Sequence, residues 1–197
     1  MIAIIDSGGA NITSVISAFD RMDVKTHFTK DADEIRSAER VVLPGVGAAG
    51  DAMAKLREYG LVEVIRSLTQ PVIGICLGMQ LLFEHSAEND TQTLGVIPGK
   101  VRAFVPGEGH TVPHMGWNEV SPKGDHPLVH GMDADTYFYF VHGYYAPASE
   151  HTIGVCHYGE DFTAMAAHRN FMGCQFHPER SSAAGQRVLK NFLQIKA

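Results

Sequence analysis

The first half of the chain alternates short, continuous apolar runs with segments whose apolar residues recur at helical spacing. The runs are Ile2–Ile5, Val24–Phe28, Arg40–Pro44 and Pro71–Ile75. Strands that are buried on both faces show such runs, and helices between them return the chain to the same edge of a sheet. The pattern therefore predicts an α/β fold with a doubly wound, mainly parallel sheet flanked by helices.

The second half, from about Gly95, has a different pattern. Its strand-like pieces are separated by Gly, Pro, Asn and Asp, which is typical of antiparallel or mixed β structure. Helices are expected over residues 76–86 and 182–195, and the helical sequence before the fourth run is expected to break at Gly60. Because no repeat or linker is visible, we expect one domain over residues 1–197 whose halves share a sheet.

The composition fits an ordinary folded domain and argues against several classes of protein. The 197 residues are 45% hydrophobic, which is enough for a buried core. A net charge of −6 argues against nucleic acid as the main partner, because binding phosphates needs a basic surface. No apolar stretch approaches the roughly 18 residues of a membrane span, and the first run is too short for a signal peptide. Three cysteines without a CxxC pair argue against a disulfide framework, so we expect a cytoplasmic protein.

The segment Gly74–Gly78 reads G-I-C-L-G, which is the pattern of a nucleophile elbow with cysteine in the place of serine. It lies between an apolar run and a predicted helix, so Cys76 is expected at a helix N-terminus, where the partial positive charge favours a thiolate. The backbone N–H of Leu77 is expected to face a developing oxyanion. The alternative is a buried structural cysteine, which the two flanking glycines and the strand–helix context disfavour.

A cysteine nucleophile needs a base, and the base needs a group that orients it. His177 and Glu179 lie two residues apart in a segment that Pro178 makes extended, so their side chains are expected to meet on one side. A strand-end histidine beside a solvated glutamate is the simpler alternative. His157, with Glu160 three residues further on, is a rival whose glycine turn makes it the weaker candidate.

The segment Gly45–Gly50 matches GxGxxG, the dinucleotide-binding pattern. It follows the third apolar run rather than the first, and no acidic residue lies about 20 positions on to bind a ribose. A nucleotide-binding oxidoreductase is therefore disfavoured. We expect the turn to supply a second oxyanion donor instead, from the N–H of Val46 or Gly47.

Several histidines raise the possibility of a metal site. They are His110, His114, His126, His130 and His142. Their spacing fits no compact ligand set, and prolines and glycines intervene, so we interpret them as loop and strand residues. No metal and no other cofactor is expected.

Three motifs, in this order, closely resemble those of the class I, triad-type glutamine amidotransferases. They are PGVG at Pro44–Gly47, GICLGMQ at Gly74–Gln80 and FHPE at Phe176–Glu179. The resemblance covers essentially the whole chain and implies a flavodoxin-like α/β fold. It also implies that Cys76 is the nucleophile, His177 the general acid and base, and Glu179 the residue that orients it.

The resemblance further implies a set of residues that hold the substrate glutamine. They are Gly45, Gln80, Glu88, Gly143 and Tyr144. The family usually has Ser or Thr where Gly143 stands, so a side-chain hydroxyl contact is missing at this position. Because backbone contacts would remain, we expect altered affinity for glutamine and not a loss of function.

Two more segments resemble one branch of this family, the glutaminase subunits of imidazole glycerol phosphate synthases. They are PHMGWN at Pro113–Asn118 and YFYFVHGYY at Tyr137–Tyr145. These subunits pass ammonia to a separate cyclase subunit with a (β/α)8 barrel, so a heterodimer is implied. The expected interface residues are Pro113, Met115, Trp117, Tyr139 and Arg180. The alternative is that these aromatic residues belong to the core.

The implied reaction is hydrolysis of glutamine to glutamate and ammonia through a cysteinyl thioester. The cyclase would use the ammonia to make imidazole glycerol phosphate and AICAR in histidine biosynthesis. Alternatives are an amidotransferase subunit of a different synthase, a freestanding cysteine hydrolase on the same fold, and a catalytically silent binding subunit. Because Gly45 and Gly47 leave their turn free to rotate, we expect a poor glutaminase that the cyclase activates.

Overall fold

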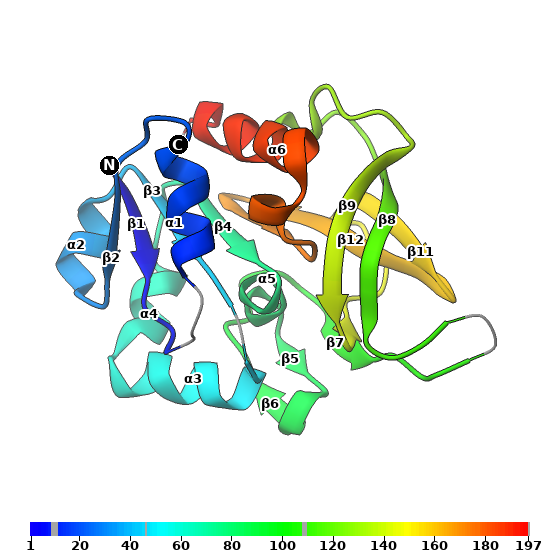
Figure 1. Cartoon of the computed structure of the whole chain (residues 1–197). Coiled ribbons are helices and arrows are strands. Elements are labelled where there is room, and N and C mark those ends of the chain that lie inside the picture. The colour runs from blue at the N-terminus through cyan, green and yellow to red at the C-terminus, as the bar shows by residue number, and fades with distance from the viewer. Residues whose placement is uncertain (9–11, 46, 108–109, 197) are drawn as a thin grey trace.

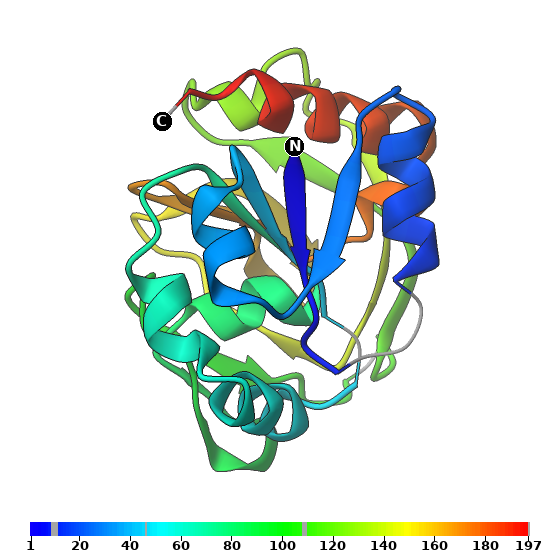
Figure 2. The same ribbon diagram turned by 90° about the vertical axis from the view of Figure 1, so that its left-hand side faces the viewer.

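The computed structural model describes residues 1–8, 12–45, 47–107 and 110–196, which form a large mixed sheet with helices on both faces (Figure 1, Figure 2). The strands are β1 (Ile2–Ile5), β2 (Thr26–Thr29), β3 (Arg40–Leu43), β4 (Val72–Ile75), β5 (His85–Ser86), β6 (Thr91–Gln92), β7 (Lys100–Ala103), β8 (His114–Pro122), β9 (Thr136–His142), β10 (Tyr144–Tyr145), β11 (Thr152–Tyr158), β12 (Glu160–His168) and β13 (Phe171–Cys174). The helices are α1 (Thr13–Asp20), α2 (Ala32–Ser37), α3 (Ala49–Glu58), α4 (Leu61–Arg66), α5 (Leu77–Leu82) and α6 (Ser182–Gln194), with 3-10 turns η1 (Glu88–Asp90), η2 (Pro127–Val129) and η3 (Pro178–Arg180). Within these ranges, no helix has the length and apolar character needed to cross a membrane.

The main sheet has nine strands in the order β2-β1-β3-β4-β13-β12-β11-β8-β9. The first four strands and β13 pair in parallel, and β12, β11, β8 and β9 continue the sheet in antiparallel fashion. Four short strands form a second sheet in the order β10-β7-β5-β6. The predicted parallel first half, the antiparallel second half and the shared sheet are therefore confirmed.

The central strands are buried on both faces, which explains their continuous apolar sequence. In β1, Ile2 and Ile4 pack in a core with residues of α1 and α6, whereas Ala3 and Ile5 pack in a second core with residues of α2 to α5. Successive side chains of a strand point to opposite faces, so each strand contributes to both cores. The helices therefore fix the sheet from two sides and leave its carboxyl edge open for a site.

Two predicted elements differ from the structure. The second strand is Thr26–Thr29 rather than 24–28, and the helix after Cys76 ends at Leu82 instead of residue 86. The chain turns extended at Phe83, and β5 then pairs with β6 and β7. The local hairpin with β6 and the pairing with β7, which lies well beyond the predicted helix, override the helical pattern. The break at Gly60 is confirmed, with φ +69° between α3 and α4.

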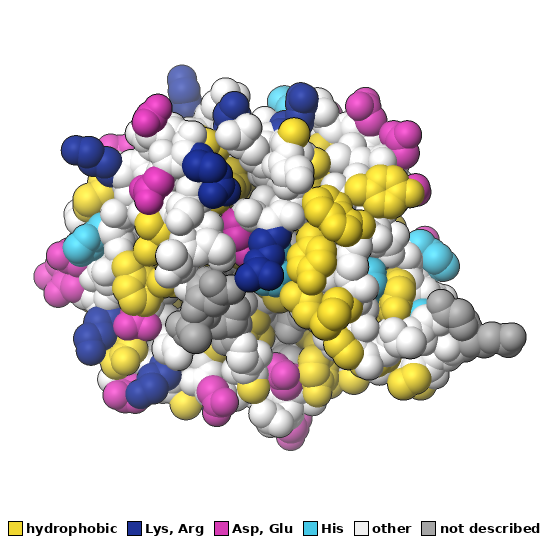
Figure 3. All heavy atoms as spheres, viewed as in Figure 1, with side chains coloured by type: hydrophobic (Ala, Val, Ile, Leu, Met, Phe, Trp, Pro, Cys, Tyr) yellow, Lys and Arg dark blue, Asp and Glu magenta, His cyan; other side chains and the backbone are white. Residues whose placement is uncertain are grey.

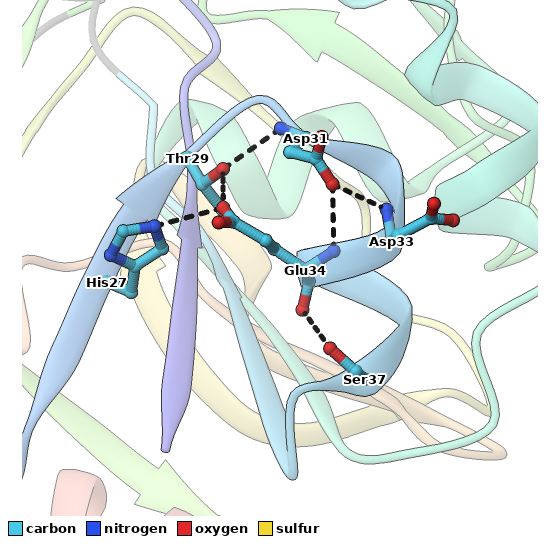
Figure 4. A network of polar contacts seen from close by, with 6 residues as sticks. All are labelled: His27, Thr29, Asp31, Asp33, Glu34 and Ser37. Atoms are coloured by element: carbon cyan, nitrogen blue, oxygen red, sulfur yellow. Dashed lines mark hydrogen bonds and ion pairs between the residues drawn. The ribbon is translucent and has the colours of Figure 1, made fainter.

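Helix α2 is fixed to the outer strand β2 by a local polar network (Figure 4). The Asp31 carboxylate accepts hydrogen bonds from the N–H groups of Asp33 and Glu34, at 2.9 and 3.0 Å, and so caps the helix. The Glu34 carboxylate in turn bonds His27 and Thr29 of β2. This network explains why so short a helix forms at the edge of the sheet.

Candidate functional site

The chain bends sharply where β4 meets α5, and Cys76 occupies the bend. Its φ of +53° and ψ of −113° are values that residues other than glycine rarely adopt. Backbone hydrogen bonds hold this conformation, because the Cys76 N–H donates to the Cys174 carbonyl at 2.8 Å and the Cys76 carbonyl accepts from Met79 and Gln80. The predicted elbow is therefore present, with its thiol at the carboxyl edge of the sheet.

The glycines around Cys76 are required by close approach of two backbone segments. A Cβ on Gly78 would lie 1.9 Å from the carbonyl oxygen of Leu43, and one on Gly45 would lie 2.2 Å from the Gly78 nitrogen. The turn after β3 thus packs directly against the first turn of α5. The first glycine of the GxGxxG match serves this packing, which brings the Gly45–Gly47 turn beside Cys76.

The side chains of His177 and Glu179 contact each other as the sequence predicts, but the backbone of this segment has a different conformation from the predicted one. His177 Nδ1 lies 2.8 Å from Glu179 Oε1. The segment is not extended throughout, because β13 ends at Cys174 and Pro178 opens the 3-10 turn η3. The expectation that Pro178 makes this segment extended was wrong, since the first position of a 3-10 turn does not use its N–H and accepts proline.

The surroundings of His177 favour its charged form. Burial opposes the charge, but hydrogen bonds to Cys76 and Glu179 outweigh it and raise the pKa of His177 to about 10. The Glu179 side chain is only 3% exposed, and its Oε2 atom has no hydrogen-bond partner within the described residues. His177 is therefore the one ion-pair partner that the described structure gives this carboxylate.

A cavity of about 310 Å³ opens onto these residues, a volume that suits a small polar substrate. Its lining includes Gly45, Gly47, Cys76, Leu77, Val141, His177, Glu179 and Arg180. The structure thus brings the predicted triad and two of the predicted oxyanion residues, Leu77 and Gly47, to one cavity. Val46, also predicted as an oxyanion donor, lies outside the described residues.

Of the predicted glutamine-binding residues, Gly45 lines the cavity, whereas Gln80, Glu88, Gly143 and Tyr144 are not among its lining residues. Gln80 is buried behind Cys76, where its Nε2 donates to the carbonyl of Tyr144 and to Gln175 Oε1, both at 3.0 Å. Glu88 Oε2 accepts from the Ala49 N–H at 2.6 Å, at the start of α3. Their contacts with a substrate stay predictions.

Gly143 joins β9 to β10 in a conformation that other residues can adopt. A Cβ built on it would meet only Val112 Cγ1, at 3.7 Å, among the described atoms, and its φ lies outside the left-handed region. The backbone and its surroundings at this position therefore accept a Cβ atom.

An apolar patch extends from the cavity across β8 and β9. It consists of Met115, Trp117, Tyr137, Tyr139 and Val141, which the antiparallel register places on one face. Met115, Trp117 and Tyr137 are 62%, 52% and 50% exposed, and Figure 3 shows hydrophobic side chains gathered over these strands. Val141 also lines the cavity, so this β8–β9 patch is continuous with the site.

Four of the predicted interface residues are thereby placed near one another, and they are not core residues. Met115, Trp117 and Tyr139 belong to the patch, with the Trp117 and Tyr139 rings 6.1 Å apart, and the exposed Arg180 lines the cavity. Pro113 is exposed next to β8. An exposed apolar surface of this kind marks an interaction site.

Sequence reasoning missed three buried residues near the site. Gln175 is fully buried, with its Nε2 3.8 Å from Cys76 Sγ. His114 and His142, interpreted as ordinary strand residues, form a hydrogen-bonded pair at 3.0 Å. Only the register of β8 and β9 could have revealed this pair. The rival His157 is exposed and pairs with Asp161, away from the cavity.

Comparisons with known proteins extend over almost the whole chain. The family model of glutamine amidotransferase class-I matches residues 3–195. Imidazole glycerol phosphate synthase subunit HisH of Xanthomonas axonopodis pv. citri is 50% identical, over 98% of this chain and 97% of that protein. The protein of the same name from Shewanella oneidensis is 47% identical, over 99% and 96%. The crystal structure of a glutamine amidotransferase matches the fold with a TM-score of 0.76 at 17% identity, covering 98% of this chain and 97% of that chain.

Iodoacetamide is predicted to alkylate Cys76 before Cys156 and Cys174. Burial raises the pKa of Cys156 to about 12 and that of Cys174 well above its ordinary value, so both stay thiols at neutral pH. Cys76 lines the cavity together with His177, whose charged form it helps to stabilise. Mass spectrometry of peptides after brief labelling measures the order, with denatured protein as the control. Equal labelling of all three in the folded protein would contradict this site.

Proposed function

The chain belongs to the class I glutamine amidotransferase family, and on that basis we propose that it is the glutaminase subunit of an imidazole glycerol phosphate synthase. It hydrolyses glutamine to glutamate and ammonia for histidine biosynthesis. Relatives that carry this subunit's name are 50% and 47% identical over nearly their whole length, which favours this synthase over others. We expect one domain over residues 1–197, working in the cytoplasm.

The observation that carries the proposal is the alignment of Cys76, His177 and Glu179 at one cavity. The Cys76 sulfur attacks the carboxamide carbon of glutamine, and His177 gives its proton to the departing ammonia. A glutamyl thioester and a neutral imidazole remain. His177 then takes a proton from water, whose oxygen attacks the thioester and releases glutamate. Glu179 keeps the imidazole oriented and stabilises its charged form.

Backbone N–H groups stabilise the oxyanion that forms in both steps. Leu77, at the start of α5, has an N–H that the helix itself does not use, and Val46 or Gly47 supplies the second. Each donor contributes about 3 kcal/mol to lowering the barrier, by analogy with measured donors. Gly47 has φ +94°, a left-handed conformation that glycine adopts without strain, and a glycine at this position leaves the turn free to change conformation. Binding of the partner fixes the conformation of this turn. The chain without its partner therefore hydrolyses glutamine slowly.

The partner is a cyclase subunit with a (β/α)8 barrel, docked on the β8–β9 patch to form a heterodimer. Ammonia released into bulk water would become ammonium and lose its nucleophilicity, so the cavity must open onto the partner. Continuity of the patch with the cavity through Val141 supports this arrangement. Arg180 and Pro113, at the edges, complete the contact. Nucleic acid and membranes have no part in the proposal, and neither does a cofactor.

Glutamine itself is held around the cavity by the residues that match the family pattern. They are Gly45, Gln80, Glu88, Gly143 and Tyr144. Glu88 meets the substrate's α-ammonium, and its bond to Ala49 beside the Gly45–Gly47 turn supports a position near the substrate. Gly143 and Tyr144 contribute backbone contacts, because Gly143 has no side chain.

Replacement of the nucleophile separates ammonia production from its use. Cys76→Ala is predicted to abolish glutamine-dependent synthesis by the complex and to leave synthesis from added ammonium salts unchanged, because the thiol acts only in making ammonia. Formation of imidazole glycerol phosphate from each nitrogen source measures this, with Cys156→Ala as the control that keeps both activities. If Cys76→Ala also removed the ammonium-dependent activity, Cys76 would be structural.

Gly143→Ser is predicted to lower the KM for glutamine about fivefold, the effect of one added hydrogen bond of about 1 kcal/mol. The side chain fits beside Val112 and restores a hydroxyl at the substrate. Steady-state kinetics of the complex with Gly143→Ala, which adds a Cβ without a hydroxyl, provide the comparison. The same KM in both variants would show that no hydroxyl contact exists at this position.

A further inference from the structure

Two buried histidines on neighbouring strands form a hydrogen-bonded pair behind the cavity. His114 of β8 and His142 of β9 face each other in the antiparallel ladder, and His114 Nδ1 lies 3.0 Å from His142 Nε2. Both are buried, and burial lowers the pKa of His114 to about 4 and that of His142 to about 3. The pair is therefore neutral at physiological pH.

The surrounding hydrogen bonds fix which nitrogen of each ring carries the proton. His142 Nδ1 lies 2.7 Å from the Tyr144 carbonyl, which can only accept, so this nitrogen is the donor. His142 Nε2 then accepts from His114 Nδ1, and His114 Nε2 accepts from Asn118 Nδ2 at 3.2 Å. The Asn118 amide orientation is set by its bonds to the His157 carbonyl and the Glu119 N–H. The hydrogen bonds from Asn118 to His114, from His114 to His142 and from His142 to Tyr144 therefore all donate in the direction of Tyr144.

We call the hydrogen-bonded series Asn118, His114, His142 and Tyr144 the relay. Aromatic packing holds its first ring, that of His114, in place. His114 is stacked between Tyr158 and Phe140, with ring centroids 3.9 and 4.8 Å apart and interplanar angles of 23° and 25°. The edges of Phe104 and Phe162 close the surroundings. A ring packed in this way moves together with its strand. It does not rotate to compensate when the strand is displaced.

The relay continues to the nucleophile through the Tyr144 carbonyl. That oxygen also accepts from Gln80 Nε2 at 3.0 Å, and the same nitrogen lies 3.0 Å from Gln175 Oε1. Gln175 Nε2 lies 3.8 Å from Cys76 Sγ. Polar contacts therefore run without interruption from Asn118 to the thiol.

The same two strands carry the β8–β9 patch on their opposite face. Met115 pairs with Val141 directly beside the His114–His142 pair, and adjacent residues of a strand point to opposite sides. Whatever docks on Met115 and Val141 presses on the strands that hold both imidazoles. The patch and the relay are thus two faces of one structural unit.

We propose that His114 and His142 are positioning residues for glutamine hydrolysis, which set the Tyr144 carbonyl and the Gln80–Gln175 pair against Cys76. A partner that binds the β8–β9 patch affects Cys76 through these two histidines. The inference rests on the proposed function for its substrate and its partner. It adds two residues that touch neither the substrate nor the reacting atoms.

Paired substitutions separate hydrogen bonding from ring packing. His142→Phe keeps a ring but cannot donate to Tyr144, and His142→Asn keeps an N–H near the Nδ1 position. We expect His142→Phe to lower kcat for glutamine about tenfold with a smaller change in KM, and His142→Asn to recover to within about threefold. His114→Phe combined with His142→Phe is expected to be no slower than the worse single variant, because the two act as a unit. His157→Gln, an exposed change outside the relay, is the control.

The measurement is glutamate release by the chain alone and with the cyclase subunit, and co-elution of each variant with the cyclase subunit in gel filtration checks folding and docking. Wild-type rates for both Phe variants in both states would overturn the inference. Equal losses in His142→Phe and His142→Asn would also overturn it, because they would point to packing alone.

Two readouts keep the test independent of folding and of the proposed function. If the variants do not fold, nitrogen NMR of the wild-type chain replaces them as the test. The rings of His114 and His142 are both expected to be neutral, with the proton on Nδ1. Any other protonation state would contradict the relay. If wild type with cyclase released no glutamate, the proposed function would fail. In that case, the rate at which iodoacetamide alkylates Cys76 would test the positioning role of His142 by itself. This role predicts that the rate changes in His142→Phe, and an unchanged rate would exclude the role.

Discussion

Burying the Glu179 carboxylate costs several kcal/mol unless a positive group accompanies it, and His177 is the group that lies within reach. The imidazole is consequently favoured as imidazolium, oriented by Nδ1 with its other nitrogen available to Cys76. Its backbone is equally constrained, because the His177 N–H donates to the Tyr139 carbonyl at 2.9 Å and its own carbonyl accepts from Ser181 Oγ. Ser181 Oγ also accepts from the Tyr139 N–H. The proposed catalytic base is thereby joined to β9, the strand that carries the exposed patch.

The nucleophile is placed by a separate constraint, which is the contact between two backbone segments. Gly45 and Gly78 allow the turn after β3 to lie directly against the start of α5, and Cys76 is held in its unusual conformation between them. A class I amidotransferase fold therefore gathers the site from the carboxyl ends of β3 and β4, the turn after β13, and β9. Since β9 also carries the patch and one member of the buried histidine pair, the proposed partner would contact a strand that is connected to the site.

Local patterns predicted the parts of the structure that depend on neighbouring residues. The continuous apolar run of β1, the break at Gly60 and the bend at Cys76 follow from burial on two faces, glycine conformation and close packing, and all were found. The helix predicted through residue 86 and the extended segment at Pro178 were wrong, the first because β5 pairs with β6 and β7, which lie outside the predicted helix, and the second because proline suits the start of a turn. The His114–His142 pair and the orientation of Gln80 depend on strand register and distant carbonyls, which no local pattern contains. The roles assigned to the substrate residues came from family resemblance.

The charge state of His177 in the free chain shows directly whether the buried Glu179 carboxylate and Cys76 hold this imidazole in its charged form. Nitrogen and proton NMR of the His177 imidazole, followed as a function of pH in wild type and in Glu179→Gln, measures it without substrate or partner. The account predicts that His177 stays imidazolium through neutral pH, with a pKa of about 10, because its bonds to Cys76 and Glu179 outweigh its burial. Glu179→Gln removes one of these partners and lowers the pKa. A neutral imidazole with an ordinary pKa near 6.5 in wild type, unchanged by Glu179→Gln, would contradict it.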